Sequence, residues 1–224
     1  MKSIMLLTKG RNTCEVLERQ LKDLLGDLAA VNSCYLDDDI KNGNIADTLI
    51  VISSKVIYQQ AVKYLDPTNS VIIARRSLNY NEIDKLIDIP AGTDVLLVND
   101  LAATANETIS LLKAAGIDHI NYYPFSPEMR QYPKLPLAVT PGELQLVPDF
   151  VQQVIDIKTR NIDFTTLVEI LKALDLLDEK ANLLSARYVK DIIDLIKKAR
   201  NMADSNRRLS NQLQTIINTV YDGI

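Results

Sequence analysis

The sequence predicts an α/β protein with a mainly parallel sheet, Rossmann-like or flavodoxin-like, followed by a long C-terminal coiled-coil helix. Short apolar runs alternate with helix-like segments from residue 4 to residue 123, a pattern typical of βαβ units. The apolar runs are continuous rather than alternating, as in parallel strands buried on both faces. Residues 181–223 then contain no proline, and their apolar residues repeat at heptad spacing.

The elements of the first half are bounded by capping residues, glycines and prolines. Asn12 or Thr13 can cap the first helix, which should end near Gly26. Ser53 or Ser54 can cap another, which Pro67 should end. We expect strands at 4–7, 28–36, 48–52, 70–74, 94–98 and 119–123. Besides the helix that ends near Gly26, we expect a short helix that begins at Asp37–Asp39 and ends at about Gly43, and helices at 56–65, 81–89 and 104–115.

The regular alternation stops at Pro124, where a proline-rich segment begins. We expect strands at 137–139 and 151–157 within or after it. Asp163 or Thr165 should cap a helix that runs to about Leu177, with a bend near Asp178–Glu179 before the long helix.

The chain length of 224 residues fits one large or two small domains. We expect an α/β ligand-sensing domain over residues 1–160 and a helical segment over 161–224. The strands can form a single sheet, or two lobes that face each other across a cleft as in periplasmic binding proteins. The sequence leaves both arrangements open.

The long helix has the spacing of a coiled-coil seam. Its apolar positions follow steps of three and four, with one Asn at an a position, which favours two parallel strands in a fixed register. The alternative is a helix packed against its own domain, but polar residues cover the other faces. We predict a homodimer whose interface comprises Ile192, Leu195, Ala199, Met202, Asn206, Leu209, Leu213, Ile216 and Val220.

Polar residues follow the predicted strands, at the sheet edge where open parallel sheets bind ligands. Hydroxyls, an arginine pair and helix N-termini suit a small anion. The alternatives are that the serines and Asn99 are caps, that the arginines form a solvated edge, and that Lys9 pairs with Asp100. The candidate ligand-binding residues are Lys9, Gly10, Ser53, Ser54, Arg75, Arg76, Asn99, Asp100, Thr140 and Gly142.

Several kinds of site are not supported by the sequence. A phosphoacceptor receiver domain needs acidic residues where Lys9 and Ser53 stand. Dinucleotide and Walker fingerprints are missing, and the single histidine, His119, gives no zinc pattern. No residues resemble a nucleophile with a base and an orienting third group, so we expect no catalytic residues and no cofactor. We also expect no metal, since Asp37, Asp38 and Asp39 suit a solvated helix start.

The net charge of −4 and the pI of about 5.1 argue against direct nucleic-acid binding. No apolar run has the length of a signal peptide or a transmembrane helix, and Cys14 and Cys34 form no motif. We expect a cytoplasmic protein that does not bind membranes.

Three strings resemble a known family. They are residues 71–76 (VIIARR), 95–100 (VLLVND) and 137–148 (LAVTPGELQLVP), the last with 154–157 (VIDI) after it. They look like the N-terminal sensory region of bacterial sigma-54-dependent transcriptional regulators. Residues 213–224 are similar to the entry into a PAS domain. The resemblance implies that PAS, ATPase and DNA-binding modules would follow, and it identifies no ligand.

Together these features predict a signal-input module that binds an unknown small-molecule effector and passes the change on through a dimeric coiled coil. One alternative is an interaction scaffold without a ligand, in which side chains would fill the cleft at the strand ends. The other is an enzyme acting on a small anionic substrate, which would need a catalytic constellation.

Overall fold

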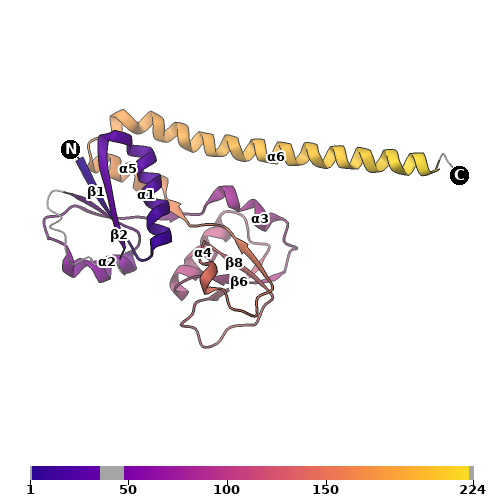
Figure 1. Cartoon of the computed structure of the whole chain (residues 1–224), viewed down its shortest axis with the longest axis horizontal. Coiled ribbons are helices and arrows are strands. Elements are labelled where there is room, and N and C mark those ends of the chain that lie inside the picture. Colours follow the sequence, from indigo (N-terminus) through magenta and orange to yellow (C-terminus); the bar gives the residue numbers. More distant parts are fainter. Residues whose placement is uncertain (1, 36–47, 222–224) are drawn as a thin grey trace. The chain divides into compact units, whose positions relative to one another are not determined.

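A computed structural model describes residues 2–35 and 48–221 (Figure 1). The helix expected at Asp37–Asp39 lies outside these residues. The strands are β1 Lys2–Thr8, β2 Ala29–Tyr35, β3 Leu49–Ile52, β4 Val71–Ile73, β5 Arg76–Ser77, β6 Asp94–Val98, β7 Asn121–Phe125, β8 Leu137–Thr140, β9 Gln153–Asp156 and β10 Asn161–Ile162. The α-helices are α1 Arg11–Leu25, α2 Lys55–Ala61, α3 Asp84–Ile87, α4 Ala102–Ala114, α5 Phe164–Ala173 and α6 Leu177–Tyr221. Short 3₁₀ helices occupy Gly26–Leu28, Val62–Tyr64, Tyr80–Glu82 and Leu144–Leu146.

The chain divides into a compact unit, Met1–Ala181, and a helical unit, Asn182–Ile224. The first unit includes α5 and the first turn of α6, so it extends beyond the expected boundary at residue 160. The expected α/β class, with parallel strands and a long C-terminal helix, is confirmed. No described helix has the combination of length and apolarity needed to cross a membrane.

The compact unit contains two separate parallel sheets, which define a first and a second lobe. The first lobe has the strand order β2-β1-β3-β4, and the second has β7-β6-β8-β9. All pairs within these two sheets are parallel. Each lobe therefore repeats one topology, in which its first and third strands are central. Of the two arrangements that the sequence leaves open, the chain adopts the two-lobed one.

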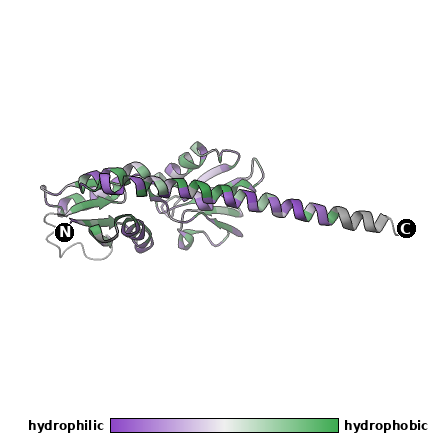
Figure 2. Ribbon diagram, turned by 90° about the horizontal axis from the view of Figure 1, so that it is seen from above, coloured by the Kyte–Doolittle hydropathy of each residue, from purple (hydrophilic) through white to green (hydrophobic). Residues whose placement is uncertain are grey.

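The first lobe is built on continuous apolar strands. All four residues of β3 are buried, and β1 ends in the buried run Leu6, Leu7 and Thr8. Helix α1 buries one stripe and ends at Gly26, whose φ of 58° suits glycine. Its N-cap is Gly10, not Asn12 or Thr13 as expected. Figure 2 shows the strands mostly in green, whereas green and purple alternate along α6.

The second lobe covers the two faces of its sheet differently. Val95 and Leu97 pack with the helices α3 and α4, while Leu96 and Val98 pack under the proline-rich segment. The aromatic residues of that segment replace a helix: Tyr132 lies edge-on to Phe125, with ring centroids 4.6 Å apart. The proline-rich segment is thus an ordered cover for the sheet.

The two lobes are joined by a short antiparallel pair of strands that the sequence analysis missed. The chain leaves the first lobe through β5 and returns through β10, and Arg76 pairs with Ile162. The Gln20 side chain of α1 holds β10 through two hydrogen bonds: its Nε2 donates to the Ile162 carbonyl (2.9 Å), and its Oε1 accepts from the Ile162 N–H (2.7 Å). We call β5 and β10 the connecting pair.

Several expected boundaries differ from the structure. Strand β7 begins and ends later than expected and contains Pro124, which is tolerated because β7 is an edge strand. The helix expected at 81–89 is reduced to a 3₁₀ turn and the four-residue α3. Helix α5 ends at Ala173, and the break before α6 lies at Asp175 (φ 50°), ahead of the bend expected at Asp178–Glu179.

Candidate functional site

The strand order of both sheets brings their ligand-binding edges together. In each sheet the chain moves outward on one side of its first strand and then on the other, which creates a topological switch point between β1 and β3 and between β6 and β8. Ligands of open α/β sheets bind at the carboxyl ends of the strands at such points. The residues that follow all four of these strands line a single cleft.

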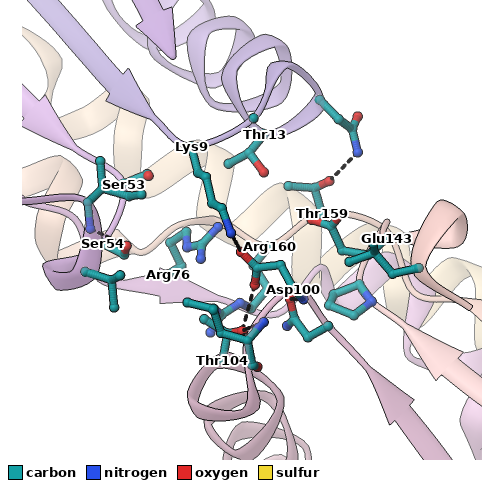
Figure 3. Close-up of a pocket in the computed structure, with 18 of the residues that line it drawn as sticks. Lys9, Thr13, Ser53, Ser54, Arg76, Asp100, Thr104, Glu143, Thr159 and Arg160 are labelled. Atoms are coloured by element: carbon teal, nitrogen blue, oxygen red, sulfur yellow. Dashed lines mark hydrogen bonds and ion pairs between the residues drawn. The ribbon is translucent and has the colours of Figure 1, made fainter. Parts of the chain in front are cut away.

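This cleft has a volume of about 820 Å³, within the range of small-molecule sites. Residues of both lobes and of the connecting pair line it (Figure 3). The lining residues are Lys9, Gly10, Arg11, Asn12, Thr13, Glu15, Ser53, Ser54, Val56, Ile57, Arg76, Asn99, Asp100, Leu101, Thr104, Pro141, Glu143, Gln145, Leu146, Thr159 and Arg160.

The first lobe contributes the turns after β1 and β3. Ser53 is buried, and its backbone N–H donates to the Leu7 carbonyl (2.9 Å), so the two turns are fixed together. Ser54 caps α2 by accepting a hydrogen bond from the Ile57 N–H at 3.4 Å. The expected capping role of Ser54 and its position in the cleft are therefore compatible.

The second lobe contributes a hydrogen-bonded turn after β6. The buried Asn99 side chain accepts from the Asp100 N–H at 2.8 Å, and the Asp100 carboxylate accepts from the Thr104 hydroxyl at 2.8 Å. The other Asp100 oxygen accepts from Lys9 Nζ at 3.2 Å. Figure 3 shows Lys9 reaching across the cleft to Asp100, with Thr104 beyond it. Lys9 and Asp100 therefore form the ion pair that the sequence allows, and this pair links the two lobes.

Two arginines of the cleft, Arg76 and Arg160, lie in or next to the connecting pair. Arg160 is almost completely buried, with a side chain only 3% exposed, and its Nη1 lies 2.9 Å from Glu107 Oε2. This contact is a close ion pair whose geometry does not meet that of a hydrogen bond, so Nη1 lacks a hydrogen-bonding acceptor among the described residues. Burying a charge in this way is costly unless it is well paired.

Arg76 is half-buried in the cleft, and no described residue forms an ion pair or hydrogen bond with its guanidinium. Burial lowers the pKa of Arg76 to about 10, and the positive charge of Arg160 acts in the same direction. The carboxylates of Glu107, Asp100 and Glu143 oppose this shift. Arg76 therefore remains charged at neutral pH, and the buried cation Arg160 lies near it.

The turn after β8 places Glu143 in the cleft. Thr140 is buried, and its hydroxyl accepts from the Glu143 N–H at 3.0 Å. Gly142 has a φ of 89°, and a Cβ there would lie 2.7 Å from the Thr159 hydroxyl and 3.3 Å from the Asn12 amide nitrogen. Asn12 donates to the Gly142 carbonyl and to the Thr159 hydroxyl, both at 3.3 Å. Only glycine fits this crowded turn.

The structure separates the predicted ligand-binding residues into two groups. Three of them do not line the cleft: Arg75 points to α5, while Thr140 and Gly142 support the turn beneath Glu143. The predicted residues in the cleft are Lys9, Gly10, Ser53, Ser54, Arg76, Asn99 and Asp100. Sequence reasoning missed Arg160 and Thr159, although both follow a predicted strand, as well as Glu143 and Asn12.

The predicted dimer seam lies on α6, which is one continuous helix rather than a hairpin. Ile192, Met202, Leu209 and Leu213 are exposed. Ala199 and Asn206 are exposed as well, and Leu195 is half-buried. An apolar row along an exposed helix is what a coiled-coil seam requires before it pairs, but the pairing itself stays a prediction.

Comparison of the chain with protein-family models, curated proteins and solved structures finds no match. Functional inference therefore depends on the chemistry of the cleft itself. Among the residues that the structure describes, no three His, Cys, Asp or Glu side chains form a group that could hold a metal ion. The cleft instead combines arginine, lysine, hydroxyl and amide donors, which are groups that bind anions.

The environment of Glu143 predicts a pH effect on stability. Burial raises the pKa of this carboxyl, and the nearby Asp100 charge adds to the effect; hydrogen bonding from Gln145 and the charges of Lys9 and Arg76 oppose it. The folded state thus binds the proton more tightly than the unfolded chain does. The resulting stabilisation is complete below the ordinary glutamate pKa and is lost as pH rises through the raised pKa.

We therefore expect Glu143→Gln to gain unfolding free energy relative to the wild type as pH rises from about 4 to about 8. Urea unfolding followed by circular dichroism at several pH values measures this difference. Glu128→Gln, at an exposed glutamate, is the matched control and should show a smaller pH dependence. A difference for Glu143→Gln that is constant with pH, or that moves the other way, would contradict the assignment.

Proposed function

We propose that this chain is a cytoplasmic signal-input module that binds a small anionic effector between its two lobes. The single observation that carries the proposal is the pair of cleft arginines. Arg160 is buried without a hydrogen-bonding acceptor for Nη1, and the Arg76 guanidinium has no partner among the described residues. A carboxylate or phosphate group can accept hydrogen bonds from both.

The charge arrangement of the cleft supports an anion over a cation. Lys9 is already paired with Asp100, and Arg160 has the half-exposed Glu107 beside it. The Arg76 guanidinium forms no ion pair with a described residue, and its pKa is lowered mainly because burial disfavours its charged form. An anionic ligand would supply a counter-charge for Arg76 and offset the desolvation cost of the buried Arg160.

The open cleft also favours ligand binding over a pure scaffold. A scaffold has no need for a cavity, and its strand ends would be filled by side chains. Here a volume of about 820 Å³ remains between polar side chains that converge from both lobes. Hydroxyls of Thr13, Ser53 and Thr104 around this volume provide further donors for ligand oxygens.

We further propose that α6 pairs with α6 of a second copy and carries the response. Its exposed row of apolar residues would be covered in a parallel coiled coil. For a ligand to act through this helix, it must bind one arrangement of the lobes better than another. The resemblance to sensory regions of sigma-54-dependent regulators fits this scheme, with PAS, ATPase and DNA-binding modules as the proposed recipients of the signal.

Anion binding should raise the thermal midpoint of the chain. At 100 times its dissociation constant, a ligand adds about 2.7 kcal/mol, which corresponds to about 5 to 10 °C for a protein of this size. We expect this rise with at least one member of a panel of phosphate, succinate and phosphorylated or dicarboxylate metabolites. Comparing the midpoint shifts with phosphate and with succinate distinguishes recognition of a phosphoryl group from recognition of a carboxylate.

Arg76→Gln should weaken binding of that anion about tenfold or more.

Arg130→Gln is the matched control, because Arg130 is exposed and does not line the cleft. Sodium chloride at equal ionic strength controls for general screening. Two results would refute the anion site: no shift of the wild-type midpoint with any anion, or an equal shift in Arg76→Gln.

The coiled-coil proposal predicts a dimer in sedimentation velocity at micromolar concentration. Asn206→Leu should keep or raise stability, because it removes a polar group from the seam, but it should broaden the distribution of oligomers. Asn201→Leu, off the seam in the same frame, should leave the distribution unchanged. A monomeric wild type would exclude the paired helix, and a strictly dimeric Asn206→Leu would show that the heptad frame is wrong.

A further inference from the structure

Two consecutive arginines face opposite sides of the chain as it leaves the first lobe. Successive side chains of an extended segment point to opposite faces. Accordingly, Arg76 lines the cleft, whereas the Arg75 guanidinium contacts α5. A displacement of β5 that follows events at Arg76 must therefore move Arg75 as well, because one peptide bond joins them.

Arg75 is attached to the start of α5 by both its backbone and its side chain. Its N–H donates to the Thr166 hydroxyl at 3.0 Å, and its carbonyl accepts from the Asp163 N–H at 2.9 Å. The guanidinium donates from Nε to the Thr165 hydroxyl at 3.1 Å and from Nη2 to Glu169 at 2.5 Å. We call these contacts the Arg75 clamp.

The partners in the Arg75 clamp are the residues that begin α5. Asp163 is the N-cap, and its carboxylate accepts from the Thr166 N–H at 2.7 Å. The Thr166 side chain is completely buried. An exposed ion pair such as Arg75–Glu169 contributes little stability on its own. The backbone bonds and the fork of the guanidinium, however, fix the direction in which α5 leaves the connecting pair.

Helix α5 is followed closely by α6. Only three residues, Leu174 to Leu176, separate them, and the Leu176 N–H donates to the Leu171 carbonyl at 2.8 Å. Leu174 and Leu176 are buried. The end of α5 and the first turn of α6 are thus closely joined. Because no flexible linker separates them, a reorientation of α5 should also move the first turn of α6.

We propose that Arg75 is a positioning residue that couples the charge state of the cleft at Arg76 to α5, and through α5 to the start of α6. The inference rests on the proposed function, in which an anion at Arg76 is the input. In this scheme Arg76 meets the ligand, and Arg75 transmits the change without touching it.

The test needs no ligand, because Arg76→Glu changes the charge of the cleft permanently. Hydrogen–deuterium exchange of the 224-residue chain would be measured for the α5 amides, with β6 as the internal reference. In the wild-type background, Arg76→Glu should change α5 exchange relative to β6 by about fivefold, a typical coupling. In Arg75→Lys or Glu169→Gln backgrounds the change should fall to less than about twofold.

Glu128→Gln serves as the control background and should preserve the full change. Both Arg75→Lys and Glu169→Gln keep the backbone hydrogen bonds of residue 75. They therefore weaken the side-chain part of the Arg75 clamp without unfolding the start of α5. The proposal is overturned if Arg76→Glu alters α5 and β6 equally, if it alters neither, or if the change persists in both clamp variants. If no anion raises the thermal midpoint, the proposed ligand is refuted. The exchange measurement still tests the coupling between Arg76 and α5, because it uses no ligand.

Discussion

The structure depends on one constraint: in the described part of the chain, the two crossings between the lobes form the short antiparallel pair β5 and β10. Because both crossings lie side by side, Arg76 on the outgoing strand and Arg160 just before the returning strand reach the same cleft. Arg75, one residue earlier, is turned towards α5. The connecting pair therefore holds the proposed ligand contacts and the proposed route of the signal within a few residues.

Two arginine side chains in the cleft lack hydrogen-bonding acceptors for their guanidinium groups among the described residues: Arg76, and Nη1 of Arg160. Arg160 is almost fully shielded from water, and its counter-ion, Glu107, is half-exposed. Arg76 adds a second cation beside it. Such an arrangement stores unfavourable electrostatic free energy, since desolvating a charge costs several kcal/mol in practice. The partly exposed Lys9–Asp100 ion pair spans the same space between the lobes, so an anion bound there would compete with Asp100 for Lys9 and would also offset the positive charges of Arg76 and Arg160.

Much of this architecture can be predicted from the sequence, because buried parallel strands are continuous apolar runs that end at caps and turns. Central strands such as β3 and β6 lie within a residue of their predicted bounds. The connecting pair was missed because two-residue strands carry no periodicity. Arg75 was placed in the cleft because sequence position alone does not show which of two neighbouring side chains turns inward.

Arg160 was missed although the strand-end rule, applied to the strand predicted at 151–157, would have found it. Glu143 and Asn12 depend on the tight turn at Gly142, which only the folded contacts reveal.

The most direct test of the central claim is a crystal structure of the chain with the anion that most raises its thermal midpoint. The account predicts ligand oxygens within about 3 Å of the guanidinium groups of both Arg76 and Arg160. An anion bound elsewhere, or a cleft between the lobes that holds only water at a saturating concentration of that anion, would contradict it.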